Sequence, residues 1–221
     1  MQATSRRVSS NQAGLHPRLA ELVRKHLAHA YRPPVSPHNL DAYARLRRGM
    51  HAQQRPLVLD SFCGTGHSTE TLARRHPGHF VVGVDKSSHR LARGPQPDAR
   101  SNYLLLRADC EAIWQLLAAD AQTLDHHYLL YPNPWPKSAH LKRRVHGHPA
   151  FAALLALGGA LELRSNWQLY VEEFRAALAL AGRPAARVQQ LPPEVVPLSR
   201  FEQKYRDSGH PLWCLQASLA P

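Results

Sequence analysis

Two stretches of this chain combine residue types that could bind a ligand or take part in a reaction. The first is the run Tyr131–Lys137, in which three prolines separate Asn133, Trp135 and Lys137. Each proline fixes its own φ and disfavours helical conformation in the residue before it, so we expect an extended, stiff platform. An apolar run that reads as a buried strand precedes it. The polar side chains should therefore lie just beyond the carboxyl end of a strand, where open α/β sheets bind ligands.

The second stretch, Leu57–Gly66, is an apolar strand that ends in Asp60 and is followed by Gly64 and Gly66. Two glycines one residue apart before a helical pattern give a backbone room for a nucleotide-like ligand. Asp85 ends the next apolar run, about 20 residues further on, at the spacing expected of a carboxylate that binds a ribose. Asp109 follows a third apolar run. It could reach an adenine amine, cap the helix that begins at Cys110, or do both.

The negative charge of these acidic residues indicates which kind of ligand they bind. A dinucleotide site would require a third glycine at position 69, which is Thr69, and Asp60 would repel the phosphates of a dinucleotide. A carboxylate suits a cationic ligand better. S-adenosylmethionine, which carries an ammonium and a sulfonium, fits this requirement.

These residues carry a family resemblance over roughly residues 55–215. The chain resembles the bacterial tRNA (guanine-N7)-methyltransferases, whose signature Pro-Asp-Pro-Trp-Pro-Lys runs into His and Lys-Arg-Arg and reads here as Pro132–Lys137 with His140 and Lys142-Arg143-Arg144. Two further family segments correspond to Asn166–Tyr170 and Ser199–Glu202. The resemblance implies S-adenosylmethionine as cofactor, with contacts at Asp60, Asp85, Asp109 and Asn133. It implies contacts to guanosine or tRNA at Lys137, Asn166, Ser199, Arg200, Phe201 and Glu202.

Three positions depart from the family pattern: Asn133 and Asn166 stand where the family usually has an acid, and Ser199 replaces a threonine. Guanine N7 has a free lone pair, so catalysis requires positioning and electrostatics more than a base. We expect Asn133, Asn166 and Glu202 to be the catalytic residues, with Glu202 accepting from the N1 and N2 edge of guanine. The two asparagines predict an enzyme that is slow or that recruits another acid such as Glu202. Trp135 and Phe201 would stack on the extruded base or pack in the core.

The charge of the chain predicts a polyanionic partner. Its 221 residues include 28 Lys and Arg against 16 Asp and Glu, a formal charge of +12. We expect tRNA to be the partner, with Lys142, Arg143 and Arg144 on its phosphates. No run could span a bilayer and no signal peptide is visible, which predicts a cytosolic protein, either a monomer or a homodimer. We expect no metal, since His126-His127 and His146/His148 lack Cys or carboxylates at ligand spacing.

Alternating apolar and helical patterns predict an α/β fold with a doubly wound, mostly parallel sheet. Strands are expected near 57–60, 80–84, 103–106, 127–131, 159–164, 186–191 and 211–215. We expect a basic N-terminal extension over 1–54, with residues 1–14 mobile, one helix over 17–30 and a second that starts with Ser36 as N-cap. The domain over 55–221 would be a class I methyltransferase domain whose reversed final hairpin is implied by the resemblance.

Two other functions stay open. Asn133-Pro134-Trp135 is close to the Asn-Pro-Pro-aromatic loop of amino-group methyltransferases that act on adenine or cytosine, and the methylated nucleoside would separate the two activities. A homologue that binds RNA but has lost turnover through its asparagines is the second alternative. Cofactor binding without methyl transfer would favour it.

Overall fold

The computed structural model describes residues 5–219, which contain one seven-stranded sheet. The strands are β1 (Leu57–Ser61), β2 (Phe80–Asp85), β3 (Tyr103–Arg107), β4 (His126–Leu130), β5 (Ala160–Ser165), β6 (Arg187–Gln190) and β7 (Trp213–Ser218). The helices are α1 (Leu19–Ala28), α2 (Pro37–Gln53), α3 (His67–Arg75), α4 (Ser88–Leu91), α5 (Cys110–Ala119), α6 (Phe151–Ala156), α7 (Gln168–Leu180) and α8 (Arg200–Asp207), with 3-10 helices η1 (Ser138–Arg143) and η2 (Val145–Gly147).

The strands are ordered β3-β2-β1-β4-β5-β7-β6, and β7 runs antiparallel between β5 and β6. The other strand pairs are parallel. The chain adds β2 and β3 on one side of β1 and then crosses to β4 on the other side. Sheets with this strand order bind ligands at the carboxyl ends of the strands where the chain crosses over, and we refer to this edge beside β1 and β4 as the crevice. The predicted doubly wound sheet and its reversed final hairpin are confirmed.

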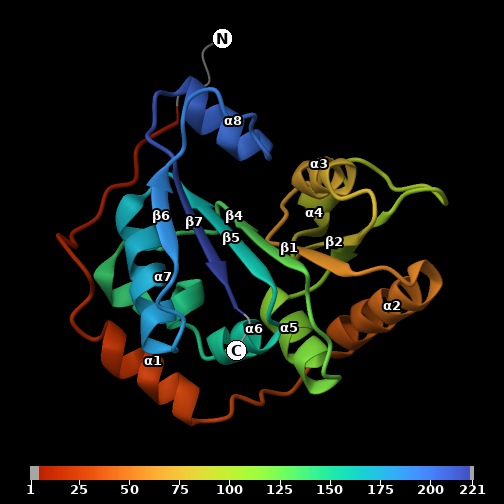
Figure 1. Cartoon of the computed structure of the whole chain (residues 1–221), viewed down its shortest axis with the longest axis horizontal. Coiled ribbons are helices and arrows are strands. Elements are labelled where there is room, and N and C mark those ends of the chain that lie inside the picture. The colour runs from red at the N-terminus through yellow and green to blue at the C-terminus, as the bar shows by residue number, and fades with distance from the viewer. Residues whose placement is uncertain (1–4, 220–221) are drawn as a thin grey trace.

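Helices cover both faces of the sheet at β1 and β2, so these two strands are buried and mainly apolar on both sides. Leu57 and Leu59 point into the larger core, to which α1, α2, α5, α6 and α7 contribute, whereas Val58 points to the other face, where α3 packs. Figure 1 shows the sheet between these two layers of helices. This two-sided burial holds the carboxyl ends of the strands in fixed positions.

The predicted positions of the strands and of the first two helices agree closely with the structure. Ser36 is the N-cap residue of α2 and Pro37 its first residue, as expected. The final strand begins at Trp213 and not at Pro211. Helix α8 was not predicted, because its eight residues are too polar to show an apolar stripe.

The two N-terminal helices belong to the same core as the sheet. Leu22 and Val23 of α1 and Leu46 of α2 are buried in it. The division of the chain at residue 54 stays a prediction. Within the described part of the chain, no helix has the length and apolar character needed to cross a membrane.

Candidate functional site

The turn after β1 brings the backbone close to the crevice. Phe62, Gly64 and Gly66 have positive φ of 63°, 63° and 80°. A Cβ atom on Gly66 would lie 2.7 Å from the Leu105 side chain, and one on Gly64 would lie 3.6 Å from the ring of Phe201. Only glycine adopts such conformations without cost, so Phe62 is a strained exception. The turn is therefore tightly packed, and at Gly66 the Leu105 side chain occupies the place that a Cβ atom would need.

Asp60 is completely buried beside this turn. Its Oδ2 accepts hydrogen bonds from the hydroxyls of Ser68 and Thr69, both at 2.7 Å, while its Oδ1 has no partner. Burial raises the pKa of Asp60 to about 6; the two hydroxyl donors oppose this shift, and the charge of Asp85 adds to it. A buried carboxylate oxygen without a partner costs free energy, so this atom is suited to receive a donor or a cation.

Asp85 stands at the carboxyl end of β2 and is also buried. Its Oδ2 accepts from the Gly64 N–H at 3.0 Å, and its Oδ1 accepts from the Ser87 N–H at 2.8 Å and pairs with Arg90 at 3.0 Å. A ribose on Asp85 would thus replace Arg90, whose side chain is 41% exposed and free to move aside. The ribose-binding role of Asp85 stays a prediction.

Asp109 is the N-cap residue of α5 by position, yet its side chain caps nothing. Its Oδ2 accepts from Asn39 Nδ2 at 3.0 Å, and its own N–H donates to Asn39 Oδ1 at 3.0 Å. This reciprocal pair joins α2 to the end of β3. Because Asp109 remains exposed, its carboxylate is still accessible to a ligand.

The proline-rich loop after β4 is stiff but not extended throughout. Tyr131 and Trp135 have positive φ of 56° and 46°, so the prediction of a uniformly extended platform is wrong at these two residues. Asn133 is exposed, and its Oδ1 accepts from the Trp135 N–H at 3.3 Å, which stabilises the bend. The Trp135 ring lies 4.8 Å from the Arg143 guanidinium and packs edge-on to His140. Trp135 is accordingly a half-exposed surface residue and not part of the core.

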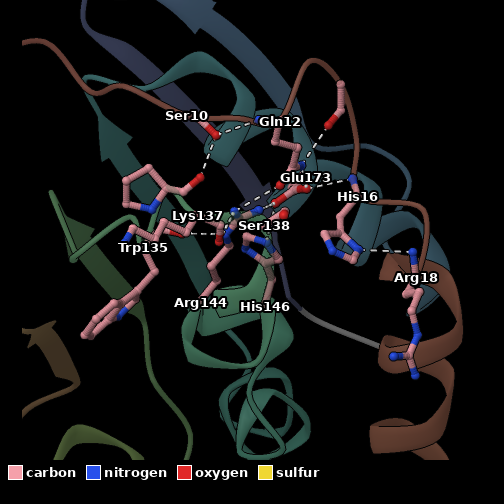
Figure 2. Close-up of polar contacts among 12 residues, drawn as sticks. Ser10, Gln12, His16, Arg18, Trp135, Lys137, Ser138, Arg144, His146 and Glu173 are labelled. Carbon is pink, nitrogen blue, oxygen red and sulfur yellow. Dashed lines mark hydrogen bonds and ion pairs between the residues drawn. The ribbon is translucent and has the colours of Figure 1, made fainter.

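Arg144 anchors this loop from below, as Figure 2 shows. Its side chain is fully buried and donates to the carbonyls of Trp135 and Lys137, at 3.2 and 3.4 Å. It also forms an ion pair with Glu173 of α7. The prediction that Arg144 contacts tRNA phosphate is therefore wrong, because a buried, paired guanidinium cannot reach a polyanion. Its neighbours Lys142 and Arg143 are exposed.

Glu173 is the centre of this buried network. It accepts from Arg144, from His146 Nε2 at 3.2 Å, from the His16 N–H at 2.8 Å and from Gln12 Nε2 at 2.5 Å. Burial alone would raise the pKa of Glu173, but the hydrogen bond from His146 and the Arg144 charge reverse this and lower it to about 2. Glu173 was missed in the sequence. The signal was present, since Glu173 interrupts the apolar stripe formed by Tyr170, Phe174 and Ala177.

The N-terminal segment is held across the same site. Ser10 Oγ donates to the carbonyl of Pro136 at 2.5 Å, and Asn11 Oδ1 accepts from the Ser138 N–H at 3.2 Å. At its start, Ser5 bonds to Ser208 and His210, so in Figure 1 the segment runs from beside α8 to α1. The prediction that residues 1–14 are mobile is wrong for residues 5–14, and Met1–Thr4 lie outside the described residues.

Helix α8 places the last predicted substrate residues. Ser199 is its N-cap and accepts from the Glu202 N–H at 3.1 Å, and Arg200 is exposed. Phe201 is 45% exposed beside Gly64, so it does not belong to the core.

Glu202 points inward from α8 and is fully buried. One oxygen pairs with Arg164 at 2.7 Å and the other accepts from the Leu198 N–H at 3.3 Å. Burial raises the pKa of Glu202, and the Arg164 charge opposes that shift. To accept from a guanine edge, Glu202 would first have to release these partners. Asn166 directly follows β5, and its Nδ2 lies 3.1 Å from His210 Nδ1.

Three comparisons relate this geometry to known proteins. Residues 54–215 match the family described as "Putative methyltransferase". The chain is 34% identical to the tRNA (guanine-N(7)-)-methyltransferase of Ectopseudomonas mendocina over 73% of this chain and 71% of that protein. It is 32% identical to the enzyme of the same name from Bordetella pertussis over 85% of this chain and 74% of that one.

Solved structures share the fold. The 16S rRNA methyltransferase KamB superposes with a TM-score of 0.59 at 20% identity and covers 86% of this chain and 96% of its own. A 16S rRNA (adenine(1408)-N(1))-methyltransferase variant from Catenulisporales acidiphilia, solved with the cosubstrate SAM, superposes with a TM-score of 0.55 at 21% identity, over 78% and 90% of the two chains. At these identities the likeness concerns the fold alone.

Proposed function

Because the chain belongs to the tRNA (guanine-N7)-methyltransferase family, we propose that it transfers a methyl group from S-adenosylmethionine to N7 of a guanosine in the variable loop of tRNA, the position 46 type. The observation that supports this most strongly is the anchored loop Pro132–Lys137. It presents Asn133 and Trp135 at the carboxyl end of β4, and buried Arg144 holds it in place. Such an activity on tRNA would place the protein in the cytoplasm.

The residues around the crevice fit the proposed cofactor. Asp60 offers an unpartnered buried oxygen, Gly64 and Gly66 give the turn beside it the positive φ values that it requires, and Asp85 and Asp109 supply two further carboxylates. These residues and Asn133 would hold S-adenosylmethionine. When bound, the cofactor would supply an electrophilic methyl group.

The protein then has to orient guanine and exclude water. Guanine N7 attacks with its own lone pair, so no side chain has to remove a proton first. Asn133 and Asn166 would contact the base or the reacting centre as neutral amides, and the Phe201 ring beside Gly64 could stack on an extruded base. Positive charge develops on the imidazole ring of guanine. A neutral amide stabilises this charge less than a carboxylate would.

Glu202 is better placed to position other residues than to contact the base. Both of its oxygens are engaged and its side chain is buried at the start of α8. Through Arg164 it ties α8 to β5, and this fixes Ser199, Arg200 and Phe201 above the crevice. For Glu202 to contact guanine directly, as the sequence suggested, it would have to release Arg164. Arg164 would then remain paired with Glu162 alone.

Exposed cations near the crevice would bind the tRNA backbone. Lys137, Lys142 and Arg143 leave the same loop and its following 3-10 helix, and Arg200 adds to them from α8. Phosphate contacts of this kind position an RNA without reading its sequence. The variable-loop guanosine would be selected by the crevice and not by these side chains.

The test is incubation of the full chain with labelled S-adenosylmethionine and unmodified tRNA, followed by digestion and mass spectrometry of the nucleosides. We expect 7-methylguanosine. Methylation of an exocyclic amine of adenine or cytosine would instead support the amino-group methyltransferase that the Asn133-Pro134-Trp135 sequence suggests. Cofactor binding without any methylated nucleoside would indicate a homologue that only binds RNA.

A further inference from the structure

Three histidines gather at the edge of the sheet opposite the crevice. His76 ends α3, His79 precedes β2, and His126 begins β4. The ring centroids lie 4.5 Å apart for His76 and His126, 5.3 Å for His76 and His79, and 5.7 Å for His79 and His126. Among the described residues, these three make up the only group of His, Cys, Asp and Glu whose potential ligand atoms all lie within 4.8 Å of one another.

The backbone that carries these histidines is fixed. Asn102 donates from Nδ2 to the carbonyls of His76 and His79, at 3.2 and 3.0 Å, and the His79 N–H donates to the His76 carbonyl at 3.0 Å. His126 belongs to a central strand of the sheet. The rings are consequently brought together by the fold and not by a flexible loop.

Two of these histidines use one ring nitrogen in a hydrogen bond, which leaves the other nitrogen for a metal. His79 Nε2 donates to Asp125 Oδ2 at 2.9 Å, and His79 Nδ1 is buried without a hydrogen-bond partner. A histidine that binds a metal almost always donates its other ring N–H to a carboxylate or carbonyl in this way. His76 Nε2 bonds to the Tyr128 hydroxyl at 2.9 Å, which likewise leaves its Nδ1 available.

Charged side chains surround the cluster, and an imidazole binds a metal through the lone pair of an unprotonated ring nitrogen. Arg75 opposes a cation here, whereas Asp125 and Glu162 attract one.

We propose that His76, His79 and His126 bind a divalent transition-metal ion, with Zn²⁺ the best fit. Neutral imidazoles are ligands for Zn²⁺, Ni²⁺ and Cu²⁺ and are poor ligands for Mg²⁺ and Ca²⁺. Nitrogens bind Zn²⁺ at about 2.0 to 2.1 Å, so the rings must turn slightly inward from their present separation. A cavity of about 490 Å³ beside His76 and His126 leaves room for water or another ligand at the fourth position.

The site is separate from the proposed methyl transfer. Parallel strands of five residues are about 16 Å long, and the histidines lie at the opposite ends of these strands from Asp60 and Asp85. The metal would tie the turn between α3 and β2 to β4. His127, the residue after His126, takes no part in the metal site. Its side chain points to the other face of the sheet and bonds to Ser61 at 2.9 Å in the core.

The test uses the tag-free full chain, stripped with a chelator and titrated with ZnCl₂ by calorimetry, in parallel with CoCl₂ by visible absorption. We expect one Zn²⁺ per chain, a raised melting temperature and the intense d–d bands of four-coordinate Co²⁺, with no binding of Mg²⁺. His126→Ala should abolish the high-affinity step, and Asp125→Asn should weaken it about 10- to 100-fold. His51→Ala, an exposed histidine of α2, is the matched control and should bind Zn²⁺ as the wild type does.

The proposal is overturned if the wild-type chain gives no Co²⁺ bands, or if His126→Ala binds Zn²⁺ with unchanged affinity and stoichiometry. With 15 histidines in the chain, binding that survives this substitution would come from other sites. Circular dichroism of each variant shows whether it folds. If His126→Ala does not fold, Asp125→Asn provides the test, and unchanged Zn²⁺ affinity in that variant would overturn the proposal. Methyl transfer should be unchanged in both variants, so this result is independent of the proposed activity.

Discussion

Substitution of Glu173 by Gln should destabilise the protein strongly, because it leaves the Arg144 guanidinium charged and buried without its counter-ion. Removing one partner of a buried ion pair typically costs about 3 to 5 kcal/mol. The lowered pKa of Glu173 agrees in direction, since the hydrogen bond and charge of His146 and the charge of Arg144 favour the ionised carboxylate in the folded protein. Since domains are stable by only about 5 to 15 kcal/mol, the cost of losing the counter-ion is a large share.

The pH dependence of stability provides a second measure of the same carboxylate. Its folded pKa lies below its ordinary value, so its stabilising effect is complete above about pH 4.5 and is lost as the pH falls toward about 2. The difference in unfolding free energy between wild type and Glu173→Gln should therefore shrink over this range.

Urea unfolding followed by circular dichroism measures both effects, with Glu172→Gln as the matched control. Glu172 is the next residue on α7 and pairs with Arg175 at the surface, so its loss should cost at most about 1 kcal/mol. Because Arg144 also holds the loop carbonyls, Glu173→Gln should slow methyl transfer even where the protein is folded. Equal urea midpoints for the two variants would refute the role given to this ion pair.

Three further predictions concern the crevice. Asp85→Ala should weaken S-adenosylmethionine binding in calorimetry by about 1.5 to 3 kcal/mol through lost charge-assisted hydrogen bonds, and unchanged affinity would exclude the ribose role. Lys142→Gln and Arg143→Gln should each reduce the slope of log tRNA affinity against log salt concentration by about one, and cofactor affinity should not change. A wild-type slope in the double variant would show that the two residues make no phosphate contacts. Asn133→Asp should raise the single-turnover rate of N7 methylation by roughly tenfold, about 1.4 kcal/mol, and a slower variant would mean that the amide donates a hydrogen bond.

Local patterns in the sequence were sufficient for the parallel strands and for the place of the crevice. Apolar runs that end in Asp60 and Asp85, each followed by a helical pattern, predict parallel strands whose carboxyl ends meet at one edge. The glycines at 64 and 66 have the positive φ that the turn requires. These features depend on neighbours in the chain, so they can be read without the tertiary structure.

Burial within the basic triplet was decided only by the tertiary structure. Lys142, Arg143 and Arg144 are adjacent and chemically alike, yet two are exposed and the third is buried against Glu173. No local rule separates them, because the partner lies on a helix that folds back from later in the chain.

The same reason applies to the segments that meet from distant parts of the sequence. Ser10 bonds to Pro136, Glu202 to Arg164, and His126 lies beside His76 and His79. A side chain's charge, partners and accessibility depend on what packs against it in space. The sequence alone therefore determined which residues could do chemistry, and the packing of the folded chain decided which of them face the crevice, which hold it in place and which form a separate cluster at the far edge.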